Sequence, residues 1–123
     1  MTAGPGLPSI DVAEAERRLR EDPGRPLLVD VREPNEFADV RAPGAVLMPM
    51  STFAARAAEL PKDRPLLVVC HLGGRSAAAT GFLLRSGWSD VVNVAGGMDA
   101  WERGGLPIRR GTPDPGEGDL PAN

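Results

Sequence analysis

Three short, largely apolar runs most constrain what this chain can fold into. They cover residues 27–31, 66–69 and 91–94, are rich in valine, and are too short to form independent helices. Runs of this kind are typical of strands that are buried on both faces of a parallel sheet. A weaker fourth run covers residues 45–48. The pattern predicts a parallel sheet in the interior of the protein.

Helix-forming segments alternate with these runs. They are expected at residues 10–21, 34–39, 52–59, 75–86 and 98–103. Ser9 and Ser51 stand directly before the first and third segments, where a side-chain oxygen can cap a helix. Strands and helices in alternation predict the fold class α/β, with a central, mostly parallel β-sheet flanked by α-helices.

The length of the chain fits one domain. With 123 residues, 41% of them hydrophobic and 25% charged, the chain can bury one core but not two. We expect the ordered domain to cover residues 9–107. Residues 1–8 and 108–123 are rich in glycine and proline and contain little to bury, so both segments are expected to be flexible tails.

Charge and cysteine content exclude several classes of protein. Fourteen basic and 17 acidic residues give a net charge of −3, so the overall field attracts neither nucleic acid nor an anionic membrane. No stretch approaches the roughly 20 apolar residues of a membrane span and the N-terminus lacks the pattern of a secretory signal, so we expect a cytoplasmic location. Because Cys70 and His71 are the only cysteine and histidine, a four-ligand zinc site is excluded, and no metal or organic cofactor is expected.

The segment that begins at Cys70 carries the chemistry. It follows the apolar run 66–69 and contains Cys70, His71, Leu72, Gly73, Gly74, Arg75 and Ser76. In parallel sheets, ligands bind at the carboxyl ends of the strands, and Cys70 stands at such an end. Two glycines allow the loop to curl so that backbone N–H groups point inward and form an anion-binding nest at the start of the next helix.

A cysteine in these surroundings is predicted to be a nucleophile. The inward N–H groups, the helix N-terminus and Arg75 favour the thiolate, which is the reactive form. The same cradle would hold the terminal sulfur of a persulfide, so we expect two steps: Cys70 takes sulfur from a donor, and an acceptor removes it. A lone cysteine after a buried strand is otherwise often a small core residue, but the Gly-Gly-Arg sequence favours the reactive interpretation.

Four pieces of the chain, in order, resemble the rhodanese homology domain family of single-domain sulfurtransferases. They are residues 29–33 with Glu36 and Phe37, residues 43–45, residues 70–76, and Gly96-Gly97 with Trp101. The resemblance covers residues 9–107. It implies a rhodanese-like three-layer domain that acts as a thiosulfate or persulfide sulfurtransferase.

The resemblance also implies roles for residues. Cys70 would be the catalytic persulfide carrier, residues 71–76 would line the substrate- and anion-binding loop, and Arg75 would bind an anionic sulfur donor such as thiosulfate. The implied acceptor is thiophilic: cyanide, a thiol or a protein sulfur carrier. The spacing Cys-x4-Arg is similar to that of sulfurtransferases, whereas the related phosphatases and arsenate reductases have one residue more.

One position departs from the family pattern. Residues 40–42 read Val-Arg-Ala, where the family often has Gly-His-Ile before Pro-Gly-Ala. Arg41 is therefore a candidate for a secondary anion contact.

Several residues have a structural alternative. Arg75 can face the Cys70 sulfur or pair with a surface carboxylate. His71 is expected to be an exposed loop residue rather than a general acid or base. Asp30, Arg32 and Glu36 are expected to form a structural network that orients the loops.

Two other functions stay open. The domain can be an interaction module or sulfur relay that works only with a protein partner, or it can be a phosphatase or arsenate reductase on the same scaffold. The short loop favours sulfur transfer over the second alternative.

Overall fold

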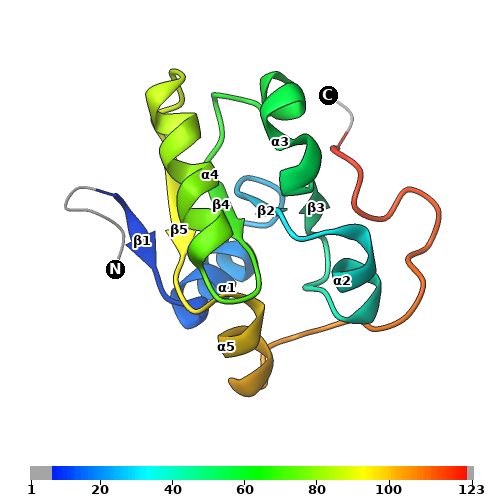
Figure 1. The fold of residues 1–123 in the computed structure, drawn as a ribbon. Helices are drawn as coiled ribbons and strands as arrows, with labels where there is room; N and C mark the ends of the chain where they lie inside the picture. The colour runs from blue at the N-terminus through cyan, green and yellow to red at the C-terminus, as the bar shows by residue number, and fades with distance from the viewer. Residues whose placement is uncertain (1–6, 122–123) are drawn as a thin grey trace.

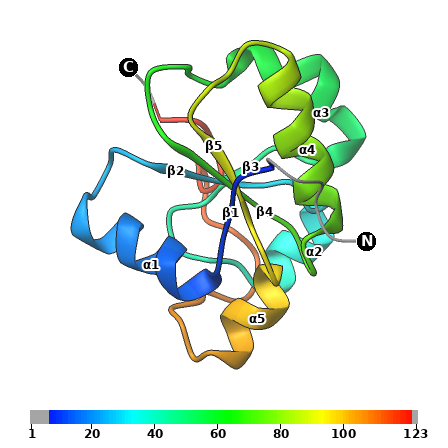
Figure 2. The same cartoon turned by 90° about the vertical axis from the view of Figure 1, so that its left-hand side faces the viewer.

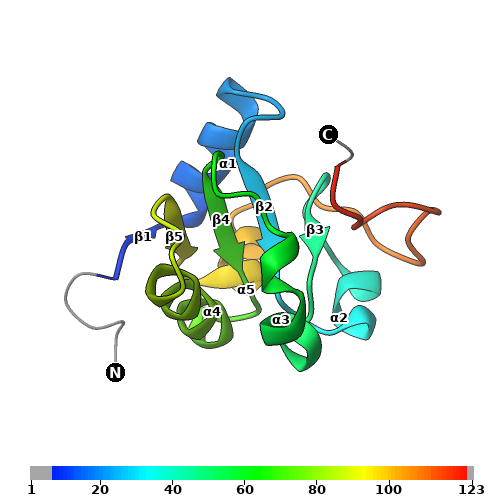
Figure 3. The same ribbon diagram turned by 90° about the horizontal axis from the view of Figure 1, so that it is seen from above.

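A five-stranded parallel sheet forms the centre of the computed structural model, which describes residues 7–121 (Figure 1). The strands are β1 (Ser9–Ile10), β2 (Leu27–Asp30), β3 (Val46–Leu47), β4 (Leu66–Val69) and β5 (Val91–Val94). Their order across the sheet is β1-β5-β4-β2-β3, as Figure 3 shows, and every neighbouring pair is parallel. The predicted α/β class and the three predicted apolar strands are confirmed.

Helices cover both faces of this sheet (Figure 2). They are α1 (Val12–Glu21), α2 (Pro34–Asp39), α3 (Met50–Arg56), α4 (Gly74–Arg85) and α5 (Gly97–Arg103), with a 3-10 turn η1 (Ala57–Glu59) after α3. Side chains alternate along the strands, because successive residues of a strand point to opposite faces. Val68 and Cys70 thus lie in the core beneath α3 and α4, whereas Leu67 and Val69 lie in the core beneath α1 and α5. No helix within residues 7–121 is long and apolar enough to cross a membrane.

Two of the predicted helix caps are wrong. Ser9 belongs to β1, and α1 is capped instead by Asp11, whose carboxylate accepts the Glu14 N–H at 2.8 Å. The helix α3 starts at Met50 rather than after Ser51. The Ser51 hydroxyl donates to Glu33 at 2.8 Å, so a contact across 18 residues outweighs the local capping preference.

The C-terminal segment, residues 108–121, makes contacts with the rest of the domain. The chain follows α2 and β3 after residue 107 (Figure 1), where the Gly118 carbonyl accepts the Leu47 N–H at 2.8 Å and Leu120 packs against the core. Up to residue 121 the segment thus makes contacts with the domain although none of its residues is fully buried, and the expectation of a flexible tail stays a prediction. Residues 122 and 123 lie outside the described residues, as does the expected N-terminal tail except for residues 7 and 8.

Candidate active site

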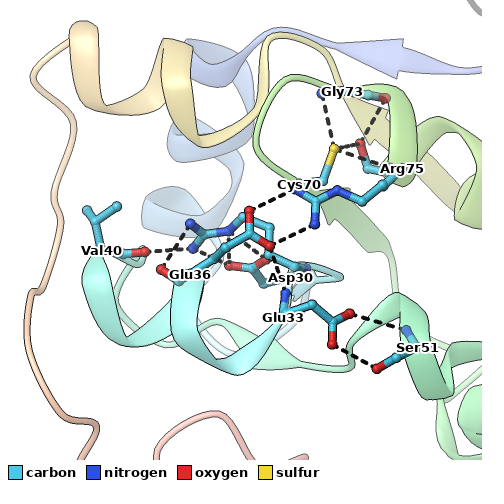
Figure 4. A network of polar contacts seen from close by, with 10 residues as sticks. Asp30, Glu33, Glu36, Val40, Ser51, Cys70, Gly73 and Arg75 are labelled. Carbon is cyan, nitrogen blue, oxygen red and sulfur yellow. Dashed lines mark hydrogen bonds and ion pairs between the residues drawn. The ribbon is translucent and has the colours of Figure 1, made fainter.

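Cys70 lies at the carboxyl end of β4, where the chain turns into α4. Its side chain is 1% exposed, at the floor of the loop that spans residues 70–75 (Figure 4). Gly73 stands before the first residue of α4 with φ of +117°, a left-handed conformation that side chains disfavour. The predicted strand–loop–helix arrangement around the cysteine is thus present.

Three hydrogen-bonding groups surround the Cys70 sulfur. The backbone N–H groups of Gly73 and Ser76 donate to Sγ at 3.1 and 3.3 Å, and the Ser76 hydroxyl oxygen lies 3.3 Å from it. The predicted nest is therefore realised at the sulfur by two backbone donors. Because these donors are fixed at the N-terminal end of a 12-residue helix, they stabilise negative charge on sulfur without rearranging.

The sequence left open whether Arg75 faces the Cys70 sulfur or pairs with a carboxylate, and the structure shows both features. The Arg75 guanidinium lies beside Cys70 and holds Glu36 of α2 with two parallel hydrogen bonds of 2.7 and 2.8 Å (Figure 4). This pairing lowers the pKa of Glu36 to about 2, with a further contribution from the Glu33 backbone N–H, and raises the pKa of Arg75 above its ordinary value. Only two of the five guanidinium N–H groups are used by Glu36, and the side chain is 38% exposed, so Arg75 can still bind an anion.

A second ion pair fixes the strand end next to the site. Asp30 and Arg32 are 0% and 2% exposed and make a 2.8 Å ion pair, and Arg32 also donates to the Val40 carbonyl. The predicted structural role of Asp30 and Arg32 is confirmed. Glu36 differs from the prediction because its carboxylate reaches Arg75 at the site, while Arg32 contacts only its backbone carbonyl.

The loop is supported from below by the turn at Gly96 and Gly97. The N–H groups of Met98 and Asp99 donate to the Cys70 and His71 carbonyls at 2.7 and 2.9 Å. Gly97 has φ of +60°, and a Cβ atom there would lie 2.4 Å from the His71 carbonyl oxygen. The sequence indicates a glycine turn at this place, but not that it holds the backbone of the loop after Cys70.

The rim of the loop is formed by exposed residues. Leu72 is 65% exposed, and His71 and Gly74 are also exposed. His71 lines a cleft of about 230 Å³ together with Glu36 of α2 and Glu102 of α5. His71 is thus an exposed loop residue, as predicted, and it borders this cleft.

Arg41 lies in the core and not at an anion site, which corrects the prediction. Its side chain is 1% exposed and packs over the Phe37 ring. It donates to Glu117 at 2.5 and 3.0 Å and to the Gly111 carbonyl at 2.7 Å. These partners come from the C-terminal segment, so the residue that departs from the family pattern holds that segment in place.

Asn93 of β5 is a site residue that the sequence analysis missed. It is 5% exposed, and its Oδ1 lies 2.6 Å from the Ser76 hydroxyl, which in turn contacts the Cys70 sulfur. The available signal was a single amide in an otherwise all-valine run.

No group of three or more potential metal ligands occurs within residues 7–121.

Comparisons with known proteins agree with this geometry. The model of the rhodanese-like domain family matches residues 11–103. The chain belongs to the rhodanese-like domain family. A protein named sulfurtransferase from Allochromatium vinosum is 41% identical over 99 residues, which are 80% of this chain and 92% of that protein.

Solved structures of other rhodanese-like domains share the fold. A rhodanese-related protein from Thermoplasma volcanium is 32% identical with a TM-score of 0.74, covering 84% of this chain and 98% of that chain. A rhodanese-like domain protein from Staphylococcus aureus is 35% identical with a TM-score of 0.70, covering 77% and 91%. The thiosulfate sulfurtransferase from Pseudomonas aeruginosa is 26% identical with a TM-score of 0.75; the match covers 86% of this chain but 21% of that one. The rhodanese-like fold predicted from the four motifs is confirmed.

Proposed function

We propose that this rhodanese-like domain is a sulfurtransferase that carries a sulfane sulfur on Cys70. The observation that carries the proposal is the Cys70 sulfur at the floor of the loop, with the Gly73 and Ser76 N–H groups aimed at it. Fixed N–H donors around the Cys70 sulfur favour formation of the thiolate. They stabilise the same negative charge again when the thiolate is released as the leaving group of the second step. The sulfurtransferase name of the relative from Allochromatium vinosum supports this reaction class.

The chemistry has two balanced steps. In the first, the Cys70 thiolate attacks the outer sulfur of thiosulfate; the S–S bond of thiosulfate breaks and sulfite leaves with the electron pair, which gives the Cys70 persulfide anion. In the second, cyanide or a thiolate attacks the terminal sulfur, and the S–S bond to Cys70 breaks with the electron pair on Sγ. A persulfide donor follows the same route with a thiolate as leaving group. The N–H groups of Arg75 that Glu36 does not use would bind the anionic donor.

The first test is the mass of the protein after exposure to donor alone. We expect wild-type protein treated with thiosulfate to gain about 32 Da, one sulfur atom, and Cys70→Ser to gain none. Thiocyanate formation from thiosulfate and cyanide should depend on Cys70 in the same way. The variant Ser86→Ala, which changes a hydroxyl residue at the distant end of α4, is the control for handling and folding.

Each failure of this test has a distinct meaning. If the wild type gains sulfur neither from thiosulfate nor from a small persulfide, the proposed activity is wrong. Turnover only in the presence of a persulfidated partner protein would favour the sulfur-relay alternative. Cys70-dependent hydrolysis of a phosphate ester would favour the phosphatase alternative.

A further inference from the structure

The side chain of Asn93 interrupts an apolar strand directly behind the catalytic sulfur. Asn93 pairs in register with Val68 of β4, and Cys70 follows two residues later on the same face of the sheet. The side chain is 5% exposed, so its amide requires an internal partner. The Ser76 hydroxyl, 2.6 Å from Asn93 Oδ1, is that partner.

The Ser76 hydroxyl has one proton and three neighbours that can accept it. Asn93 Oδ1 lies at 2.6 Å, the Gly73 carbonyl oxygen at 3.1 Å and Cys70 Sγ at 3.3 Å. The short distance assigns the proton to Asn93, which leaves a lone pair of the Ser76 oxygen facing sulfur. A Cys70 thiol can donate its proton to that lone pair, so the two side-chain protons, Cys70 S–H and Ser76 O–H, both point away from sulfur.

The Ser76 hydroxyl has a different role when the Cys70 sulfur carries a negative charge. The Gly73 and Ser76 N–H groups are backbone donors and already point at Sγ. Within residues 7–121, the Ser76 hydroxyl is the one side-chain group hydrogen-bonded to Sγ. Rotation of its O–H from Asn93 to sulfur would add a third donor to a thiolate.

We propose that Asn93 is a positioning residue that holds the Ser76 hydroxyl proton away from Cys70 while sulfur is a thiol and releases it when sulfur becomes anionic. Within residues 7–121 the Asn93 side chain is hydrogen-bonded to Ser76 and not to the Cys70 sulfur, so it acts through Ser76. In the second step of the proposed reaction, breakage of the S–S bond places the electron pair on Sγ, and the Ser76 O–H turns to that charge. The role of Asn93 in the second step rests on the proposed sulfur transfer. Its role in holding the Ser76 proton while Cys70 is a thiol does not.

The test measures the pH dependence of Cys70 alkylation by iodoacetamide, which reacts with the thiolate. Asn93→Leu keeps a similar volume and removes the nearest competing acceptor, so only the Gly73 carbonyl at 3.1 Å still competes with sulfur for the Ser76 proton. We expect the pH midpoint of alkylation to move to lower pH by about half a unit, equivalent to about a threefold change in the thiol–thiolate ratio and to part of one net hydrogen bond.

A double-mutant cycle separates positioning from general damage to the strand. In the background Ser76→Ala no hydroxyl remains, so adding Asn93→Leu should leave the alkylation midpoint unchanged. Asn93→Val, which suits the all-valine strand, replaces Asn93→Leu if that variant does not fold. Circular dichroism and thermal unfolding establish that each variant is folded.

Each possible result of the double-mutant cycle either supports or overturns the inference. A downward shift that requires Ser76 supports the inference. No shift, an equal shift in both backgrounds, or an upward shift overturns it; an upward shift would mean that the Asn93 amide donates to Ser76 and supports the thiolate. Because alkylation needs no sulfur donor, a failed transferase assay with the expected shift would overturn the proposed function and leave this inference standing.

Discussion

Arg41 and Arg75 each hold a glutamate with two hydrogen bonds, yet they lie in opposite settings. Arg41 is 1% exposed and binds Glu117, 76 residues away in the C-terminal segment. Arg75 is 38% exposed and binds Glu36 beside the Cys70 sulfur. In sequence, both were candidates for contacting an anionic substrate.

Burial separates the two arginines into different roles. All the contacts of Arg41 are internal, and a buried guanidinium without its partners would be an uncompensated charge. Arg75 shares its charge between a carboxylate and solvent, so a substrate anion can reach it. An arginine–glutamate pair with two hydrogen bonds thus stabilises the fold at Arg41, whereas at Arg75 the guanidinium stays accessible to an anion.

The largest expected effect is on stability and follows from Arg41→Ala. The substitution removes the ion pair with Glu117, the bonds to two carbonyls and the packing on Phe37. We expect the free energy of unfolding, measured by urea denaturation, to fall by about 3 kcal/mol, and the activity per folded molecule to stay near that of the wild type.

A surface pair provides the matched control for this experiment. Arg56 and Glu59 on the exposed side of α3 and η1 are 39% and 50% exposed, so Arg56→Ala should change the free energy of unfolding by less than about 0.5 kcal/mol. If Arg41→Ala is as stable as Arg56→Ala, the buried pair does not hold the C-terminal segment and the comparison fails.

Most of the elements and the loop after Cys70 could be predicted from the sequence because they follow local rules; β1 was missed, since Ser9 and Ile10 were expected to cap and begin the first helix. Short apolar runs indicate β2, β4 and β5, and the loop after Cys70 follows from glycines between a strand and a helix. The pairs that decide the roles of Arg41 and Arg75 join residues 76 and 39 positions apart, which no local pattern relates. Asn93 was hidden for a similar reason, since its partner Ser76 is 17 residues away.

The second prediction concerns activity and follows from Arg75→Ala. Loss of one charge-assisted hydrogen bond to thiosulfate should lower kcat/KM for this donor by about tenfold to a hundredfold. The free energy of unfolding should fall less than in Arg41→Ala, because the pair is half-buried. Arg75→Lys keeps the charge but loses the planar fork, so it should restore only part of the activity. Unchanged kcat/KM in Arg75→Ala would assign Arg75 a structural role like that of Arg41.

The third prediction is a gain from Glu36→Gln. In the proposed reaction, the carboxylate of Glu36, which Arg75 holds, would compete with an anionic donor for Arg75 and repel it. Neutralising it should lower the KM for thiosulfate about twofold to fivefold, within the range of a solvent-exposed ion pair. The matched variant Glu117→Gln, at the buried arginine, should leave this KM unchanged. A higher KM in Glu36→Gln would mean that Glu36 is needed to orient Arg75.

The smallest expected effect is a loss of stability in acid, and it allows Glu36 and Glu117 to be compared directly. Arginine hydrogen bonds lower the pKa of both Glu36 and Glu117 to about 2 in the folded protein, against an ordinary value of 4.5. Since the unfolded chain binds these protons more readily, the stabilisation is complete above about pH 4.5 and is lost as pH falls toward 2. For the half-exposed Glu36 pair, solvent screening limits it to below about 1 kcal/mol.

Salt distinguishes the two pairs in the same measurement. Urea unfolding at pH 6 and pH 3 should show a smaller acid loss in Glu36→Gln and in Glu117→Gln than in the wild type. Added salt should shrink the Glu36 contribution more, because ions screen an exposed pair better than one whose arginine is 1% exposed. Equal salt dependence of the two contributions would mean that solvent reaches Arg41 as readily as Arg75, and that burial is not what separates their roles.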